Sequence, residues 1–202
     1  MGRTVSTSVV FTDLVGSTEL SARVGPEESE QLRQVHFGLL RNAFAAAGGT
    51  EVKNLGDGLM VVFPSVSAAI EGSVSALHAL ERRNRRSVEP LLVRVGISTG
   101  DAVEEDGDYF GETVVEAARL CAQAAGGEIL ATEVVALLAR SSEHVFESVG
   151  PVELKGLPAP VPTVRVLWAA EPAESDVALP PRIAAAAGDE AGFVGRADEL
   201  RV

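Results

Sequence analysis

Two aspartates in this sequence stand where an apolar run gives way to a turn. Asp13 follows the β-branched run at residues 7–11, and Asp57 lies between Gly56 and Gly58. Either aspartate alone is explained by backbone hydrogen bonding at a strand end or in a turn. As a pair, a strand that ends in one carboxylate and a hairpin that presents another can meet at one edge of a sheet. Two carboxylates there would hold Mg²⁺ or Mn²⁺, and such a site suits phosphoryl transfer.

The elements that must position these aspartates can be read from hydrophobic spacing. Residues 7–11 predict a buried strand. Ser17 or Thr18 can cap the helix that follows, which breaks at Gly25-Pro26. Helical spacing then resumes over residues 27–47. The apolar runs on both sides of the Gly-Asp-Gly turn predict a hairpin, and they cover residues 50–55 and 59–63.

The second half of the sequence continues the alternation of helices and strands. Helical spacing extends over residues 65–81, 113–124 and, more briefly, 132–139. Short apolar runs predict strands at residues 91–99, 128–131, 145–149, 152–154 and 163–168. Residues 101–108 form an acidic excursion around Gly107 that interrupts the strand pattern. Helices separated by paired strands indicate an α+β fold, a ferredoxin-like sandwich with helices packed on a mainly antiparallel sheet.

Composition limits the classes of partner. The 202 residues carry 29 acidic and 17 basic side chains, a formal net charge of −12, and only 4% aromatic residues. A chain this acidic is repelled by phosphate backbones and has few aromatic faces on which bases can stack, so we expect no nucleic-acid partner. A ferredoxin-like RNA-binding domain needs a basic face and exposed aromatic residues, so the same composition disfavours it.

The sequence also bears on the compartment. No apolar run approaches the roughly 20 residues that span a bilayer, and no charged-then-apolar signal segment opens the chain. The single cysteine, Cys121, cannot form an internal disulfide. We therefore expect a cytoplasmic protein with no membrane partner.

Three stretches of the sequence carry a more specific signal than the aspartates alone. They are FTDLVGST at residues 11–18, EVKNLGDG at residues 51–58, and DYFG at residues 108–111 followed by AARL at residues 117–120. In this order and spacing they resemble the class III adenylate and guanylate cyclase catalytic domain, over roughly residues 6–168. The resemblance implies cyclisation of a nucleoside triphosphate to the 3′,5′-cyclic monophosphate with release of pyrophosphate. It also implies two metal ions and a head-to-tail homodimer with its sites at the interface.

The resemblance assigns roles to the residues that match the family motifs. Asp13 and Asp57 match the two metal-binding aspartates. Arg119 matches the arginine that meets the phosphates in the transition state. Lys155, within the run ELKG, resembles the late lysine that holds the triphosphate. An exposed lysine in a strand-to-turn connection is the alternative explanation for Lys155.

Lys53 and Asp108 match the pair that reads the base in this family. Their chemistry can be tested against the base edges: adenine presents an acceptor at N1 and a donor at N6. A lysine is a donor only, and an ionised carboxylate is an acceptor only, so the two side chains complement adenine. Guanine presents the reverse order and would leave both side chains unpaired. ATP is therefore the expected substrate.

Val115 departs from the family pattern. The position four residues after Gly111 is an asparagine that orients the ribose in the family, whereas Val115 can neither donate nor accept a hydrogen bond. Loss of one such group costs on the order of 10²–10³ in rate, roughly 3–4 kcal/mol. The sequence thus predicts an adenylate cyclase of reduced activity; the alternative is a catalytically degenerate module that binds ATP or dimerises to regulate a downstream domain. Thr113 or Glu116 could also replace the asparagine.

The end of the sequence differs in composition. Residues 171–192 are rich in alanine, proline and acidic side chains, which is typical of linkers. Residues 192–200, GFVGRADEL, resemble the segment that opens many regulatory ATPase domains, and a frayed acidic terminus is the alternative. We therefore assign residues 1–169 to the cyclase-like domain and residues 170–202 to a linker and the start of a downstream ATPase domain.

Overall fold

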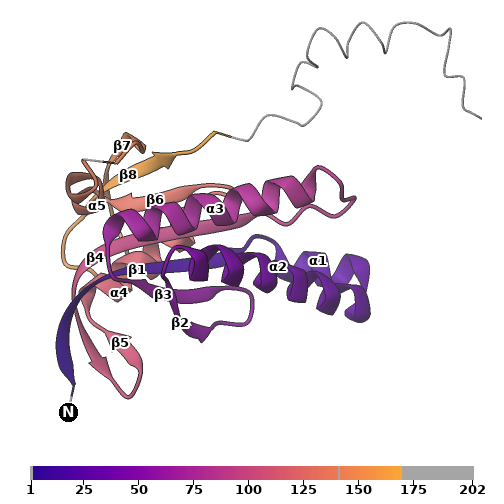
Figure 1. The fold of residues 1–202 in the computed structure, drawn as a ribbon, viewed down its shortest axis with the longest axis horizontal. Coiled ribbons are helices and arrows are strands. Elements are labelled where there is room, and N and C mark those ends of the chain that lie inside the picture. The colour runs from indigo at the N-terminus through magenta and orange to yellow at the C-terminus, as the bar shows by residue number, and fades with distance from the viewer. Residues whose placement is uncertain (1, 141, 170–202) are drawn as a thin grey trace, which may run out of the picture. The chain divides into compact units, whose positions relative to one another are not determined.

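The computed structural model describes residues 2–140 and 142–169 (Figure 1). Its helices are α1 (Ser17–Val24), α2 (Pro26–Ala46), α3 (Val66–Asn84), α4 (Glu112–Gln123) and α5 (Glu133–Leu138). Its strands are β1 (Arg3–Leu14), β2 (Thr50–Asn54), β3 (Leu59–Phe63), β4 (Val93–Glu105), β5 (Asp108–Phe110), β6 (Ile129–Thr132), β7 (Val145–Val152) and β8 (Val161–Leu167). The linker and the ATPase-like segment predicted at 170–202 lie outside the described residues. None of the described helices is long and apolar enough to cross a membrane.

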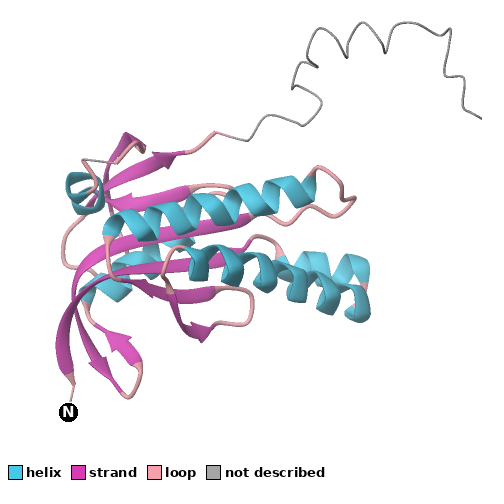
Figure 2. Ribbon diagram, viewed as in Figure 1, coloured by secondary structure: helices cyan, strands magenta, loops and turns pink. Residues whose placement is uncertain are grey.

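One mixed sheet forms the centre of the described fold. Its strands follow the order β2-β3-β1-β4-β6-β8-β7, and β5 pairs with β4. Neighbouring strands are antiparallel except β4 and β6, which are parallel. Figure 2 shows the helices packed against this sheet. The predicted α+β fold with a mainly antiparallel sheet is therefore confirmed.

Alternation along β1 divides its side chains between two cores. Val10 and Leu14 face the side covered by α2 and α3, and Val9 and Phe11 face the side covered by α4. Figure 1 shows α2 and α3 side by side on one face of the sheet and α4 behind it. Asp13 follows Val9 and Phe11 at the two-residue spacing of a strand, so it lies on the α4 side.

Two glycines let neighbouring elements approach closely. A Cβ atom at Gly58 would lie 1.8 Å from the carbonyl oxygen of Thr12, and one at Gly96 would lie 2.2 Å from the carbonyl oxygen of Ala117. Any larger residue would push these backbones apart. Gly58 therefore allows the β2–β3 turn to lie against the end of β1, and Gly96 allows α4 to lie against β4.

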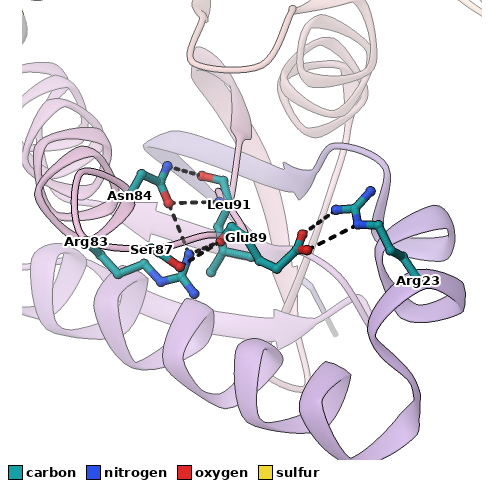
Figure 3. Close-up of polar contacts among 6 residues, drawn as sticks. All are labelled: Arg23, Arg83, Asn84, Ser87, Glu89 and Leu91. Carbon is teal, nitrogen blue, oxygen red and sulfur yellow. Dashed lines mark hydrogen bonds and ion pairs between the residues drawn. The ribbon is translucent and has the colours of Figure 1, made fainter.

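The loop between α3 and β4 is held by side chains (Figure 3). Asn84 donates to the carbonyl oxygen of Leu91 (2.9 Å) and accepts from the Leu91 amide (2.8 Å). The carboxylate of Glu89 forms an ion pair with Arg23 of α1 (2.5 Å). Two further donors reach the carbonyl oxygen of Glu89, namely Arg83 and Ser87. The start of β4 is thus fixed relative to both α3 and α1.

The acidic stretch at residues 101–108 is part of a hairpin, so the predicted end of the strand at residue 99 is wrong. β4 continues to Glu105 and turns back through Asp106-Gly107 into β5. Both turn residues have positive φ, 53° and 80°, as a two-residue type I′ turn requires. The apolar pattern fails here because Ala102 is the only buried residue in this half of β4, which pairs with β1 and β5.

The late strands also differ from the prediction. β7 runs unbroken from Val145 to Val152, through the Gly150-Pro151 pair that was expected to separate two strands. A register shift between Ser148 and Gly150 accommodates the pair, and β7 lies at the edge of the sheet, where proline is tolerated.

Candidate active site

The two aspartates predicted to bind metal lie together at the end of β1. The amide of Leu14 donates to the carbonyl oxygen of Asp57 (3.1 Å), and the amide of Leu59 donates to Thr12 Oγ1 (2.9 Å). These bonds attach the β2–β3 turn to β1 on both sides of Asp13. The backbone segments that carry Asp13 and Asp57 therefore meet here, and the charge of Asp57 contributes to raising the pKa of Asp13. The predicted meeting of a strand end and a hairpin at one place is confirmed.

Each of these carboxylates has one protein partner at its Oδ2 atom. Arg94 donates to Asp13 Oδ2 from Nη2 (2.6 Å) and Nε (2.7 Å). Ser17 donates from its hydroxyl to Asp57 Oδ2 (2.8 Å). Burial raises the pKa of Asp13 above its ordinary value, the hydrogen bond from Arg94 opposes that rise, and the charge of Asp57 adds to it. The pair is a concentration of negative charge, and Arg94 is the arginine that contacts it among the described residues.

This donor set fits Mg²⁺ or Mn²⁺. Carboxylate oxygens are the ligands that these hard cations prefer, and two like charges held together favour a cation between them. Within residues 2–140 and 142–169, no group of three or more His, Cys, Asp or Glu side chains gathers at one place. The protein therefore offers two carboxylates, and water or ligand oxygens would supply the remaining positions around a bound ion.

His36 supports the Asp57 turn from the other side. Its ring is fully buried on α2, and its Nε2 atom lies 3.2 Å from the carbonyl oxygen of Asp57. A carbonyl oxygen only accepts, so the proton is on Nε2. Nδ1 is buried without a hydrogen-bond partner. Burial lowers the pKa of His36 to about 4, which keeps the ring neutral at neutral pH.

Lys53 and Asp108 form the second pair. Lys53 Nζ contacts both carboxylate oxygens of Asp108, at 2.7 and 2.6 Å, and the amide of Tyr109 donates to the same carboxylate (2.8 Å). The hydrogen bond from Lys53 lowers the pKa of Asp108, so Asp108 is an ionised acceptor. The two residues come from β2 and β5, so their ion pair joins two strands that are not neighbours in the sheet. A donor and an acceptor thus lie side by side, as the base-reading prediction requires.

Arg119 and Lys155 form the third pair. Arg119 projects from α4, and its Nε donates to the carbonyl oxygen of Lys155 (3.0 Å). Lys155 lies in the loop at residues 153–160, which lines an open hollow of about 460 Å³. The six predicted site residues are therefore brought together as three pairs within one chain.

Comparison with known proteins decides the family. Residues 1–167 match the adenylate and guanylate cyclase catalytic domain. The chain belongs to this family. An adenylate/guanylate cyclase/hydrolase from Silicibacter pomeroyi superposes with a TM-score of 0.74 at 27% identity, covering 84% of this chain and 100% of that one. The adenylyl cyclase CyaB from P. aeruginosa superposes with a TM-score of 0.75 at 26% identity, covering 85% and 98%.

Curated relatives place the cyclase domain within much longer proteins. An adenylate cyclase of Podospora anserina is 31% identical over 166 residues, which cover 69% of this chain and 8% of that protein. An uncharacterized protein of Mycobacterium tuberculosis is 33% identical over 157 residues, which cover 78% of this chain and 40% of that protein. The chain therefore spans less than half the length of these relatives.

The cyclase helix α4 carries the departure from the family pattern on its outer face. Val115 is 37% exposed and precedes Arg119 by four residues, so both side chains lie on one face of the helix. Thr113 donates to the carbonyl oxygen of Asp101 (3.0 Å), and Glu116 accepts from Ser98 (2.6 Å). These bonds direct both side chains toward β4. Neither side chain therefore lies with Val115 on the outer face of α4.

Three residues that hydrogen-bond to Asp13 or Asp57 were not predicted from the sequence to do so. They are Ser17, His36 and Arg94. Arg94 left a signal, because it is the only charged residue in the apolar run at 91–99. For Ser17 the sequence suggested a helix cap, and that prediction is wrong: Gly16, with φ of 67°, is the N-cap of α1, and no side chain caps it.

Proposed function

We propose that this cyclase domain converts ATP into 3′,5′-cyclic AMP and pyrophosphate with two divalent metal ions. The observation that carries the proposal is the pairing of the Asp13 and Asp57 carboxylates at the end of β1. Relatives named adenylate cyclase in Podospora anserina and Mycosarcoma maydis support ATP as the substrate.

In the proposed reaction the ribose 3′-oxygen attacks the α-phosphorus. A bond forms between O3′ and the α-phosphorus, the bond to the bridging oxygen of the β-phosphate breaks, and pyrophosphate leaves; the 3′-hydroxyl proton passes to solvent. Asp13 and Asp57 would hold Mg²⁺ or Mn²⁺, which would favour ionisation of the 3′-hydroxyl and neutralise triphosphate charge. Arg119 stabilises the charge that develops on the phosphates, and Lys155 holds the triphosphate.

The base is read by Lys53 and Asp108. In the free domain the two side chains bond to each other across 2.6 Å, and they are 39% and 33% exposed. An ion pair this exposed is weak in water, so an incoming base can open it. Adenine N1 then accepts from Lys53, and the N6 amino group donates to Asp108.

We further propose that the domain works as a head-to-tail homodimer. One protomer supplies Asp13 and Asp57, and its partner supplies the base-reading pair and the α4 arginine. Val103 and Phe110 face each other across β4 and β5 and are 40% and 50% exposed, which suits a surface covered by a second copy.

The direct test is the reaction itself. Purified protein incubated with ATP and Mn²⁺ should form cyclic AMP, separated from ATP by chromatography and identified by mass. The Asp57→Ala variant is the negative control. Binding of ATP without cyclic AMP formation, under single-turnover conditions, would favour the second candidate function.

The shared site has its own test. A chain with Asp13→Ala and a chain with Arg119→Ala should each be inactive, and mixing them should restore about a quarter of the parental rate, because half of the dimers are mixed and each holds one intact site. Sedimentation or native mass spectrometry must show that mixed dimers form. Mixed dimers without any recovered activity would contradict the shared site.

The second candidate is a cyclase-like module that binds ATP or dimerises to regulate a further domain without turnover. One observation favours it: Val115 places an apolar side chain on the face of α4 that carries Arg119.

A further inference from the structure

Arg94 lies directly opposite Asp13 in the sheet. The two residues are register partners in the antiparallel pairing of β1 and β4, and both lie on the α4 side. The Arg94 guanidinium donates twice to Asp13 Oδ2, at 2.6 and 2.7 Å. Arg94 Nη1 also donates to the carbonyl oxygen of Ala122 on α4 (2.8 Å). Three bonds therefore fix the guanidinium between a strand and a helix. A guanidinium held by three hydrogen bonds has little conformational freedom, so Arg94 stays beside Asp13.

This placement alters the charge available to a metal ion. Asp13 and Asp57 together carry two negative charges, and Arg94 contributes one positive charge at hydrogen-bond distance. The ion pair is only 31% and 28% exposed, so solvent screens it incompletely. A divalent cation that approaches this site without nucleotide therefore meets a net charge of −1 rather than −2. A bound triphosphate would restore strong attraction by adding several negative oxygens.

We propose that Arg94 is a positioning residue that holds Asp13 and offsets half the charge of the carboxylate pair, so that a divalent cation binds firmly only together with the triphosphate. The inference rests on the metal site of the proposed function. Its consequence is an order of binding: the free domain keeps Asp13 oriented by Arg94 without retaining a metal ion of its own.

The test measures Mn²⁺ binding without nucleotide, by the electron paramagnetic resonance signal of free Mn²⁺ at neutral pH. Arg94→Gln should bind Mn²⁺ about tenfold more tightly than the parent, because one repelling charge beside the site is gone. Arg94→Lys keeps the charge and should bind Mn²⁺ like the parent. Adding Asp13→Asn to Arg94→Gln should abolish the gain.

Several outcomes overturn the inference. Arg94→Gln binding Mn²⁺ no more tightly than the parent, with a native circular dichroism spectrum, would show that Arg94 does not limit metal binding. If Arg94→Gln does not fold, Arg94→Lys decides: a tenfold gain there would contradict the charge argument, and parental affinity would support it. A gain that persists when Asp13 is Asn would locate the metal elsewhere.

Different results would contradict the role of Arg94 and the proposed cyclase activity. Tighter Mn²⁺ binding by Arg94→Gln, without cyclic AMP formation by the parent, would leave the role of Arg94 intact and remove the cyclase activity. Cyclic AMP formation by the parent, with unchanged Mn²⁺ affinity in Arg94→Gln, would do the opposite.

Discussion

The end of β1 and the outer face of α4 are supported very differently. At the end of β1, Arg94 and Ser17 each bond to one carboxylate, and His36 holds the turn that carries Asp57. On α4, Arg119 makes one bond to a backbone carbonyl, and the valine one turn before it is exposed. Two carboxylates held close together repel each other, so they need hydrogen-bond donors from the same chain. An exposed guanidinium is solvated by water and needs no such partner.

The comparison separates two halves of the proposed site. At the carboxylate end, hydrogen bonds from side chains of the same chain hold both aspartates. In the proposed function, the α4 face would gain its partners from the triphosphate and from a second copy of the chain. Changes at the first region should therefore act on metal binding and folding, and changes at the second should act on turnover.

The largest effect is expected at the carboxylate end. Asp57→Ala should lower the rate of cyclic AMP formation by about 10³-fold or more, because a site with two protein carboxylates has no ligand to spare. Initial rates across a Mn²⁺ titration measure this. Asp106→Asn, which changes a carboxylate in the β4–β5 turn, is the matched control and should leave the rate unaltered. Unchanged metal dependence in Asp57→Ala would contradict the proposed metal site.

His36 predicts a pH dependence of stability at the same end. Its pKa is about 4 in the folded domain against 6.5 in the unfolded chain, so unfolding takes up a proton between these values. The stabilisation is fully present above pH 6.5 and is lost as the pH falls toward 4, by about 3 kcal/mol. Urea unfolding at several pH values measures it, with His36→Gln against the parent.

His36→Gln should flatten that pH dependence, because glutamine does not titrate. His144→Gln, in the loop before β7, is the matched control and should keep the parental slope. Equal slopes in the parent and in His36→Gln would show that the buried ring does not set the acid stability.

The proposed base-reading pair, Lys53 and Asp108, should give a smaller effect. Lys53→Glu with Asp108→Cys removes the donor that adenine N1 needs, and should lower the ratio of ATP to GTP turnover by about tenfold or more. The matched control is the surface ion pair of Arg41 and Glu51, joined at 2.6 Å, with both replaced by alanine. A ratio that stays at the parental value would show that the pair does not read the base.

The sequence allowed the local elements to be predicted where turns and periodicity agree. The break at Gly25-Pro26 and the hairpin around Asp57 are as expected. The β4–β5 hairpin was missed although Asp106-Gly107 is a hairpin signal, because its strands lack an apolar alternation. Spacing along one strand carries no information about a pairing with a strand 81 residues away, so the Asp13–Arg94 register could not be predicted.

The residues of the candidate site also differ in whether the sequence allowed them to be predicted. Asp13 and Asp57 were predicted as a pair from their places at a strand end and in a turn, and the resemblance to the family motifs then added Lys53 and the other matched residues. The supports depend on side chains that meet only in the folded chain, such as a buried histidine on α2 behind the Asp57 turn. Single residues of ordinary type leave no motif, and even Arg94, a lone charge in an apolar run, does not reveal its partner until the chain is folded.

The smallest effect is expected on α4, where the missing polar group lies. Val115→Asn places an amide one helical turn before Arg119, on the same exposed face. The rate of cyclic AMP formation should rise about tenfold while ATP affinity changes little, because the added hydrogen bond matters chiefly in the transition state. Single-turnover rates at saturating ATP and Mn²⁺ measure the gain. Val134→Asn on α5, at a comparably exposed valine, is the matched control. If Val115→Asn and the parent both make no cyclic AMP, the regulatory module becomes the better description of this domain.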